Sequence, residues 1–308
     1  MQWSQIKSLF IICFLVLDIF LVIQFLEKQE SSDIGLLERQ DVTVEQQLAD
    51  ENIKIKKQPS ELPDESFISV KQRKFEKEDI ELLLTKDNQD AAILNDNLIV
   101  SELKKPIKLA KDTSDEQIME VMSSFIMHYQ SYQFGEWDKD NRVIYLFQVT
   151  NQRPVYFNKS GIVILYMNED NEITSYTQTM LDEPETNKDK KSLIKPTDAV
   201  WKLYENNRLK TGEEITDMRV GYHTVVPLES GVQVFVPTWN VTVNNEQHYF
   251  VNAIEGMVFP GNQLEFLKDA IKTNLDKIIM LQGNDKLKDT LIEQLEDKLE
   301  QINRSDIS

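Results

Sequence analysis

The three histidines are the first residues to test for metal binding or catalysis, because a neutral imidazole serves both roles near physiological pH. His128, His223 and His248 are far apart in the sequence, and none has a partner at the spacing of an H-E-x-x-H helix. His128 lies in an amphipathic helical pattern, which predicts a surface or half-buried side chain rather than a metal ligand. Acidic clusters at residues 138–141 and 169–171 lack the alternating ligand spacing of a calcium loop and predict turns. The sequence therefore predicts no metal site.

Serine and lysine spacings give a second candidate chemistry. Residues 192–195 read S-L-I-K and residues 210–212 read K-T-G, which match fragments of the penicillin-binding enzyme signature. The first pattern occurs twice more in the chain, and no S-D-N element lies between the two fragments. The chain also lacks G-x-S-x-G, and its nine glycines form no phosphate-binding loop. We predict that the protein is not an enzyme and binds no cofactor.

Asp18 is the most informative acidic residue, because it interrupts the apolar stretch LFIICFLVLDIFLVIQFL at residues 9–26. A carboxylate at mid-bilayer costs about 2.5–3.5 kcal/mol unless it is neutral or partnered. At helical spacing it shares one stripe with apolar side chains, and we interpret that stripe as a partner-binding face: Ile11, Phe14, Asp18, Leu21 and Phe25. The alternative is an anchor that merely tolerates a neutral or snorkelling carboxyl.

The stretch at residues 9–26 is long enough to cross most of a bilayer as one helix. Lys7 and the amino terminus precede it, so residues 1–8 are predicted to be cytoplasmic and the bulk extracytoplasmic. A cleaved signal peptide is the competing interpretation, but Gln24, Phe25 and Leu26 offer no small-x-small cleavage site. We therefore expect an uncleaved single-pass anchor in the cell membrane.

The net charge of −18 argues against a nucleic-acid partner, since phosphate binding needs a basic surface. The same charge should hold the exported part away from an anionic membrane. The single cysteine, Cys13, lies in the apolar stretch, so the exported part has no disulfides and depends on packing for its stability.

The rest of the chain predicts an α+β protein. After a stalk at residues 27–40 we expect two units, each a helix followed by antiparallel strands, at residues 41–182 and 183–260. The first helix begins at a capping box, Ser114 to Gln117, and its apolar residues recur as far as Tyr129. The second begins after Pro196 and is expected to end at Gly212.

Residues 261–308 form a helical extension with apolar residues at heptad spacing, interrupted near residues 283–285. The pattern fits a coiled coil that allows self-association, a helical hairpin, or helices docked onto the body. Only two heptads lie on each side of the interruption, and the pattern does not decide between these arrangements.

Four stretches of the chain match a known pattern: the first 28 residues, V-E-Q-Q-L-A-D-E-N-I-K-I, S-F-I-S-V-K-Q-R-K-F, and P-T-W-N-V-T-V-N-N-E-Q-H-Y-F-V-N-A-I-E-G-M-V. Together they resemble the YycI (WalI) family of membrane proteins of Gram-positive bacteria, and the resemblance covers roughly residues 1–260. It implies one transmembrane helix, an extracytoplasmic domain, and association with the YycH (WalH) co-regulator and the sensor histidine kinase YycG (WalK).

The resemblance also implies that signalling to the kinase, which controls cell-wall metabolism, passes largely through transmembrane helices. The stripe around Asp18 would then be the contact face. The helix-plus-sheet units also resemble PepSY-like domains, which leaves an extracytoplasmic ligand-binding or peptidase-inhibiting module as the alternative function.

Overall fold

The computed structural model describes residues 14–22, 24, 43–60, 62, 64–186, 189–227, 231–259, 261, 263–282 and 285–305. The chain divides into two compact units, Met1–Asp50 and Glu51–Ser308. In the first unit, residues 14–22 are helical and α2 spans Val44–Asp50. No helix in this described part of the chain is long and apolar enough to cross a membrane. The predicted span at residues 9–26 lies partly outside the described residues.

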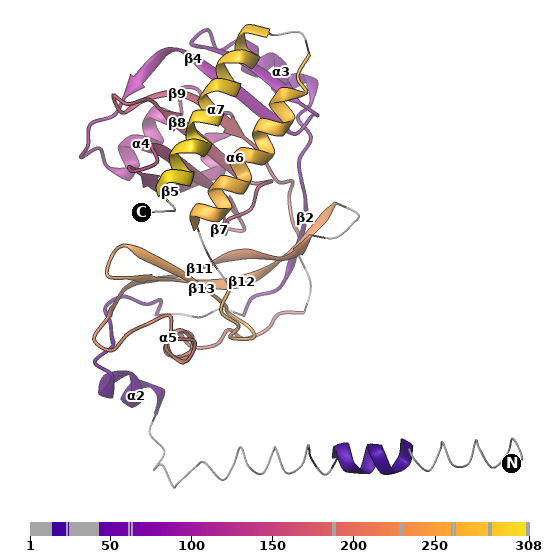
Figure 1. Ribbon diagram of the computed structural model, residues 1–308, viewed down its shortest axis with the longest axis vertical. Coiled ribbons are helices and arrows are strands. Elements are labelled where there is room, and N and C mark those ends of the chain that lie inside the picture. Colours follow the sequence, from indigo (N-terminus) through magenta and orange to yellow (C-terminus); the bar gives the residue numbers. More distant parts are fainter. Residues whose placement is uncertain are drawn as a thin grey trace, which may run out of the picture. The chain divides into compact units, whose positions relative to one another are not determined.

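The second unit contains one curled sheet that has two regions (Figure 1). The large sheet region is antiparallel, and its strands are ordered β3 (Gln89–Leu94), β4 (Leu98–Lys108), β9 (Glu172–Gln178), β8 (Ile162–Met167), β6 (Val143–Thr150) and β5 (Tyr132–Asp138). The small sheet region contains β1 (Lys54–Ile55), β2 (Ile68–Lys71), β10 (Glu185–Thr186), β11 (Glu214–Pro227), β12 (Val232–Val243) and β13 (Gln247–Asn252).

Strand β7 (Arg153–Tyr156) joins the two regions, because it pairs antiparallel with β6 and parallel with β11. Strands β1 and β2 come from the stretch predicted as the first unit, yet they pair with β11 and β12 of the predicted second unit. The predicted α+β class is confirmed, because α-helices pack around one curled sheet. The unit boundary at residues 182/183 stays a prediction.

The core follows the two-residue period of the strands in the large sheet region. Along β6, Val143, Tyr145 and Phe147 join the cluster under the C-terminal helices, whereas Ile144 and Leu146 join the cluster on the opposite face. Strand β8 alternates in the same way. Both faces are covered, which explains why these strands are continuous runs of apolar residues rather than alternating ones.

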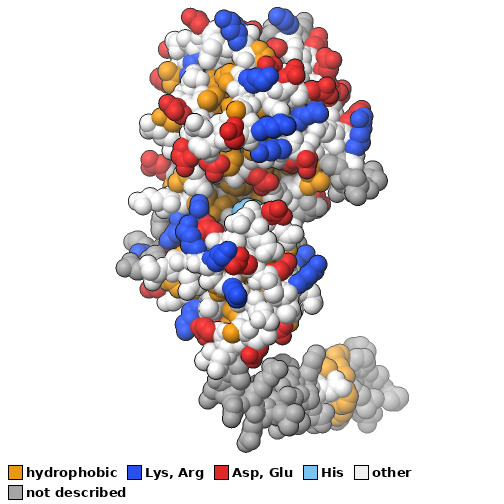
Figure 2. Space-filling model, turned by 90° about the vertical axis from the view of Figure 1, so that its left-hand side faces the viewer, with side chains coloured by type: hydrophobic (Ala, Val, Ile, Leu, Met, Phe, Trp, Pro, Cys, Tyr) orange, Lys and Arg blue, Asp and Glu red, His pale blue; other side chains and the backbone are white. Residues whose placement is uncertain are grey.

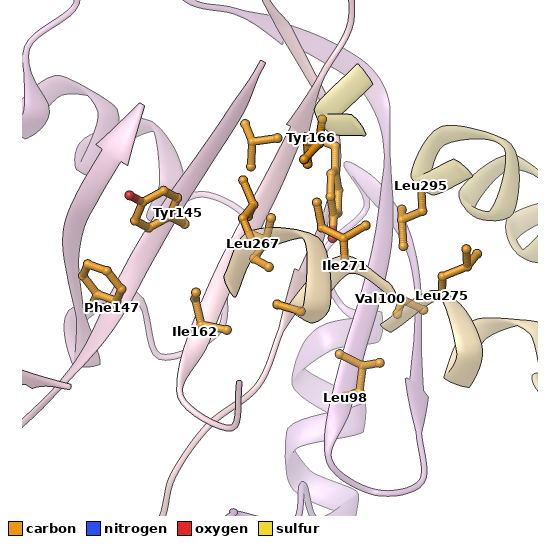
Figure 3. Packing of buried hydrophobic residues seen from close by; sticks show 14 of the residues in the cluster. Leu98, Val100, Tyr145, Phe147, Ile162, Tyr166, Leu267, Ile271, Leu275 and Leu295 are labelled. Carbon is orange, nitrogen blue, oxygen red and sulfur yellow. The ribbon is translucent and has the colours of Figure 1, made fainter. Parts of the chain in front are cut away.

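The C-terminal extension is a pair of contacting helices, α6 (Gln263–Ile279) and α7 (Asp285–Ser305), docked on one face of the large sheet region (Figures 1 and 3). Figure 3 shows Leu267, Ile271 and Leu275 of α6 and Leu295 of α7 directed at strand residues such as Tyr166. The heptad positions are thus buried or half-buried within the chain itself, so of the three open arrangements the structure has a helical hairpin docked on the body.

Helix α4 (Asp115–Met122) begins at the predicted capping box, with Gln117 N donating to Ser114 Oγ at 3.3 Å. The prediction that helical spacing continues to Tyr129 is wrong, because the helix ends at Met122. The hydroxyls of Ser123 and Ser124 donate to backbone carbonyls three residues back and compete with continuation of the helix. Phe125 and Ile126 are buried all the same, in the turn that follows.

Helix α5 (Pro196–Glu205) starts with the predicted proline and packs against β12 and β13. The predicted end at Gly212 is wrong. Asn207 takes the left-handed conformation, with φ of 57°, directly after the helix, a role in which asparagine can replace glycine.

A further short helix, α3 (Lys77–Leu84), precedes β3, and a 3₁₀ turn, η1 (Tyr129–Ser131), precedes β5.

Candidate functional site

The predicted partner-binding stripe lies in the first unit, and the structure describes three of its five residues. Phe14, Asp18 and Leu21 lie in one helical segment with exposed side chains. Their spacing of four and three residues places them on one face. Ile11 and Phe25 lie outside the described residues. The stripe stays a prediction.

The second unit contains a groove between the large and the small sheet regions. It consists of two adjoining cavities of about 500 and 360 Å³, both lined by Phe157, His248, Phe250 and Gln263. We call these two cavities together the interregion groove. Volumes of this size are typical of small-molecule or peptide sites. In Figure 2 hydrophobic side chains and a histidine reach the surface between the two regions.

The groove is lined by a continuous set of aromatic rings from both sheet regions. The centroid of the Phe157 ring lies 5.2 Å from that of Phe147 and 5.1 Å from that of Phe250, and both pairs are edge-to-face. The Phe157 ring also packs on the ring of Phe266 on α6, with 5.2 Å between the ring centroids. The rings of Tyr156 and Phe250 have centroids 5.0 Å apart. Such pairs add about 0.5–1.5 kcal/mol beyond burial. The aromatic rings therefore fix the relative position of the groove walls.

Phe157 has an unusual backbone, with φ of +47°. A bulky residue in this region is strained by about 1–3 kcal/mol and persists only when its surroundings enforce it. The neighbouring Asn158 does so, since its Nδ2 donates to Thr224 Oγ1 at 2.7 Å and to Gln233 Oε1 at 2.5 Å. The strained turn holds the half-buried Phe157 ring at the centre of the groove, where it lines both cavities.

A hydrogen-bonded trio forms one polar end of the groove. Tyr145 Oη donates to Glu136 Oε2 at 2.7 Å, and Gln263 Nε2 from the start of α6 donates to both groups. Burial and the charge of Glu136 raise the pKa of Tyr145 well above its ordinary value, so the phenol stays a donor. The trio attaches α6 to β5 and β6 and holds the Glu136 carboxylate in the groove.

Further charges lie on β11 and at the start of α4. Arg219 Nε contacts Asp217 Oδ2 at 2.5 Å, and Lys57 contacts the other oxygen at 3.1 Å. Partial desolvation and the charge of Glu116 raise the pKa of Asp115, while Arg219 acts in the opposite direction. These groups make the groove a partly desolvated, charged environment in which added charges interact more strongly than in bulk water.

The structure brings together two histidines that the sequence treats as unrelated. His223 and His248 line the same cavity, because their strands β11 and β13 both pair with β12. His223 stacks on Phe259 at 4.4 Å, and burial lowers its pKa. Desolvation within the groove also lowers the pKa of His248. Over the described residues, no group of three or more metal-ligating side chains has a geometry that could hold an ion.

The His128 side chain is partly exposed, as its sequence pattern predicts, although the residue lies beyond the end of α4. Its Nε2 contacts Asp79 Oδ1 at 3.1 Å, and Arg73 contacts the same carboxylate at 3.3 Å. Burial opposes ionisation of Asp79, but hydrogen bonds from Glu76 and His128 and the charge of Arg73 together hold its pKa below the ordinary value. This cluster ties α3 to the turn that follows α4.

The sequence patterns could not locate the groove, because its residues come from α4, β5, β6, β7, β11, β12, β13, α6 and the adjoining turns. One signal was available in the sequence, namely the adjacent aromatic residues Tyr156 and Phe157 directly before the turn at Asn158.

Comparison with known proteins identifies a family. The family described as YycI protein matches residues 31–254. No curated protein matches the chain. An uncharacterized protein from Eubacterium rectale ATCC 33656 aligns with a TM-score of 0.42 and 12% identity, covering 68% of this chain and 91% of that one. YycH from Bacillus subtilis aligns with a TM-score of 0.38 and 13% identity, covering 64% of this chain and 54% of that one.

Proposed function

The chain belongs to the YycI family, whose members are regulatory proteins of the YycFG two-component system, and from this premise we propose that it is a membrane-anchored, extracytoplasmic regulator of a sensor histidine kinase. Residues 9–26 form the anchor, residues 1–8 lie in the cytoplasm and the remainder lies outside the cell. The positive charge of Lys7 and the amino terminus supports this orientation.

The observation that carries the proposal is Asp18 within the apolar stretch. A helix that served only as an anchor would gain nothing from a group that costs about 2.5–3.5 kcal/mol at mid-bilayer. Contact with polar groups of another transmembrane helix offsets that cost. The stripe formed by Ile11, Phe14, Asp18, Leu21 and Phe25 then binds the kinase of the YycG type and the co-regulator of the YycH type.

The experiment compares two substitutions in the same helix. Asp18→Leu removes the polar group from the stripe, whereas Gln24→Leu makes a similar change on another face. We expect Asp18→Leu to reduce the kinase recovered with the full-length protein from native membranes at least fivefold and to change cell-wall gene expression. Gln24→Leu should leave both unchanged.

Two outcomes would contradict this function. In one, an unrelated transmembrane helix replaces residues 9–26 with no change in signalling. In the other, mature protein isolated from cells lacks the first thirty residues, which would identify a cleaved leader rather than an anchor.

The interregion groove favours a second candidate, an extracytoplasmic ligand-binding or peptidase-inhibiting module of the PepSY-like kind. Under this alternative a chain that begins at Glu27 acts without its anchor. Under the first proposal that shortened chain loses its effect on the kinase. Signalling measured with the shortened chain exported from the cell distinguishes the two.

A further inference from the structure

We infer that the interregion groove binds an extended polypeptide segment that carries basic side chains next to apolar ones. This inference does not rest on the proposed function, because the groove is formed entirely by the second unit. Three independent properties of the groove support it: its charge, its aromatic lining and the strand that forms one of its edges.

Charge complementarity favours a basic ligand. The described residues lining the two cavities include a single lysine or arginine, Arg219, against five carboxylates: Asp115, Glu136, Asp217, Glu265 and Asp269. Lys57 and Lys159 contact two of these acids from outside the lining. The acids Asp115 and Glu136 have no lysine or arginine within ion-pair distance in the described part of the chain. A phosphate or another anionic ligand would be repelled, whereas an ammonium or guanidinium group would be attracted.

The aromatic lining gives the ligand an apolar anchor. Phe157 lies on both cavities and its ring is only partly buried, so it has surface left to cover. Its strained backbone is held in place by Asn158, and strained residues of this kind cluster at binding sites. The strained backbone also places the ring where its uncovered part faces a ligand in the groove.

The edge strand gives an extended chain a backbone to pair with. Residues 133–136 of β5 line the groove, and among the described strands β5 pairs only with β6. A peptide that adds to such an edge gains main-chain hydrogen bonds, and its alternate side chains point to one side. The edge of β5, Asp217 of β11 and the ring of Phe157 line the same cavity, so one peptide on that edge lies in the cavity that contains them. A peptide therefore uses all three properties at once.

The experiment measures binding of fluorescein-labelled hexapeptides to the full-length protein in detergent by fluorescence polarisation. The test peptide is Lys-Val-Lys-Leu-Lys-Val, and the charge-reversed peptide is Glu-Val-Glu-Leu-Glu-Val. Hexalysine tests charge without apolar anchors, and unlabelled chitohexaose tests whether the aromatic lining takes a sugar instead. We expect saturable binding of the test peptide, at least tenfold tighter than either control peptide, which weakens as salt is added.

Two matched variants test the site. Asp115→Asn removes a carboxylate from the groove, whereas Glu116→Gln removes its exposed neighbour in the same helical turn, outside the groove. Asp115→Asn should weaken the test peptide about two- to fivefold and Glu116→Gln should not. Phe157→Gly keeps the left-handed turn, which glycine adopts without strain, and removes the ring; it should weaken binding at least tenfold.

Circular dichroism melts confirm that each variant is folded before its affinity is compared. The inference is overturned if the test peptide does not bind saturably, or if hexalysine binds as tightly. Equal effects of Asp115→Asn and Glu116→Gln would assign the attraction to the acidic surface as a whole and overturn it as well. Displacement of the bound test peptide by chitohexaose at a comparable concentration would show that the groove is a sugar site and overturn the inference as well.

Discussion

Replacing Ile271 by alanine should destabilise the second unit by about 3 kcal/mol. Ile271 is fully buried on the sheet-facing side of α6 and packs in the cluster with Tyr166 and Leu295 (Figure 3). Removing three carbons at about 0.8 kcal/mol each gives roughly 2.4 kcal/mol. The cavity left behind adds to this, and the better helix propensity of alanine returns about 0.4 kcal/mol.

The matched control is Ile279→Ala, the same substitution at the end of the same helix, where the side chain is 46% exposed. It should change stability by less than about 0.5 kcal/mol. Urea titration in a background with Trp3, Trp137 and Trp201 replaced by phenylalanine, followed by the fluorescence of Trp239, which is fully buried in the small sheet region, measures both variants. The corresponding fall in melting temperature for Ile271→Ala is about 6–12 °C.

The result that would refute this reasoning is a loss below about 1 kcal/mol for Ile271→Ala, or a separate early transition. Either would mean that α6 and α7 unfold apart from the sheet. Trp239 reports on the small sheet region, so a single shifted transition shows that the hairpin and the sheet form one cooperative unit.

Three further predictions concern other buried groups. Asp79→Asn should lower the free energy of unfolding by about 2 kcal/mol at pH 7, measured by urea unfolding, because His128 and Arg73 lose the carboxylate that they contact. Since the pKa of Asp79 is lowered in the folded state, this deficit should shrink as the pH falls below about 4. Burial and the charge of Arg142 lower the pKa of Lys298 to about 8, so Lys298→Met should stabilise the protein by about 2 kcal/mol at pH 7. This gain should shrink as the pH rises from about 8 and vanish above about pH 11.5, where both states hold a neutral amine. Gly221→Ala should cost at least about 2 kcal/mol in the same assay, because its Cβ would lie 2.7 Å from the carbonyl oxygen of Pro154.

Local signals in the sequence predicted the elements better than their ends. The capping box at Ser114 and the proline at residue 196 located the starts of α4 and α5, because both act through groups within one turn. The ends of both helices were predicted wrongly. Hydrophobic periodicity continued past Met122 because Phe125 and Ile126 are buried in a turn, and burial alone does not show whether a segment is helical.

Sheet pairing was beyond the reach of patterns along the chain. Strands β2 and β12 fall in different predicted units, yet they pair across more than 160 residues of sequence. The interregion groove depends on such pairings, since β7 brings Phe157 from the large region to the acids of β11. The aromatic and acidic residues were visible in the sequence, but their meeting was not.

The groove and the C-terminal hairpin share α6, which links ligand binding to the packing of the body. Gln263 and Phe266 at the start of α6 line the groove, and Ile271 and Leu275 further along the same helix pack on the sheet. A ligand that contacts the first turn therefore binds only the state in which α6 is docked. By mass action, a ligand at one hundred times its dissociation constant would stabilise that docked state by about 2.7 kcal/mol. Binding in the groove should therefore largely offset the loss caused by Ile271→Ala, and a ligand that bound without raising the stability of this variant would show that the groove does not depend on α6.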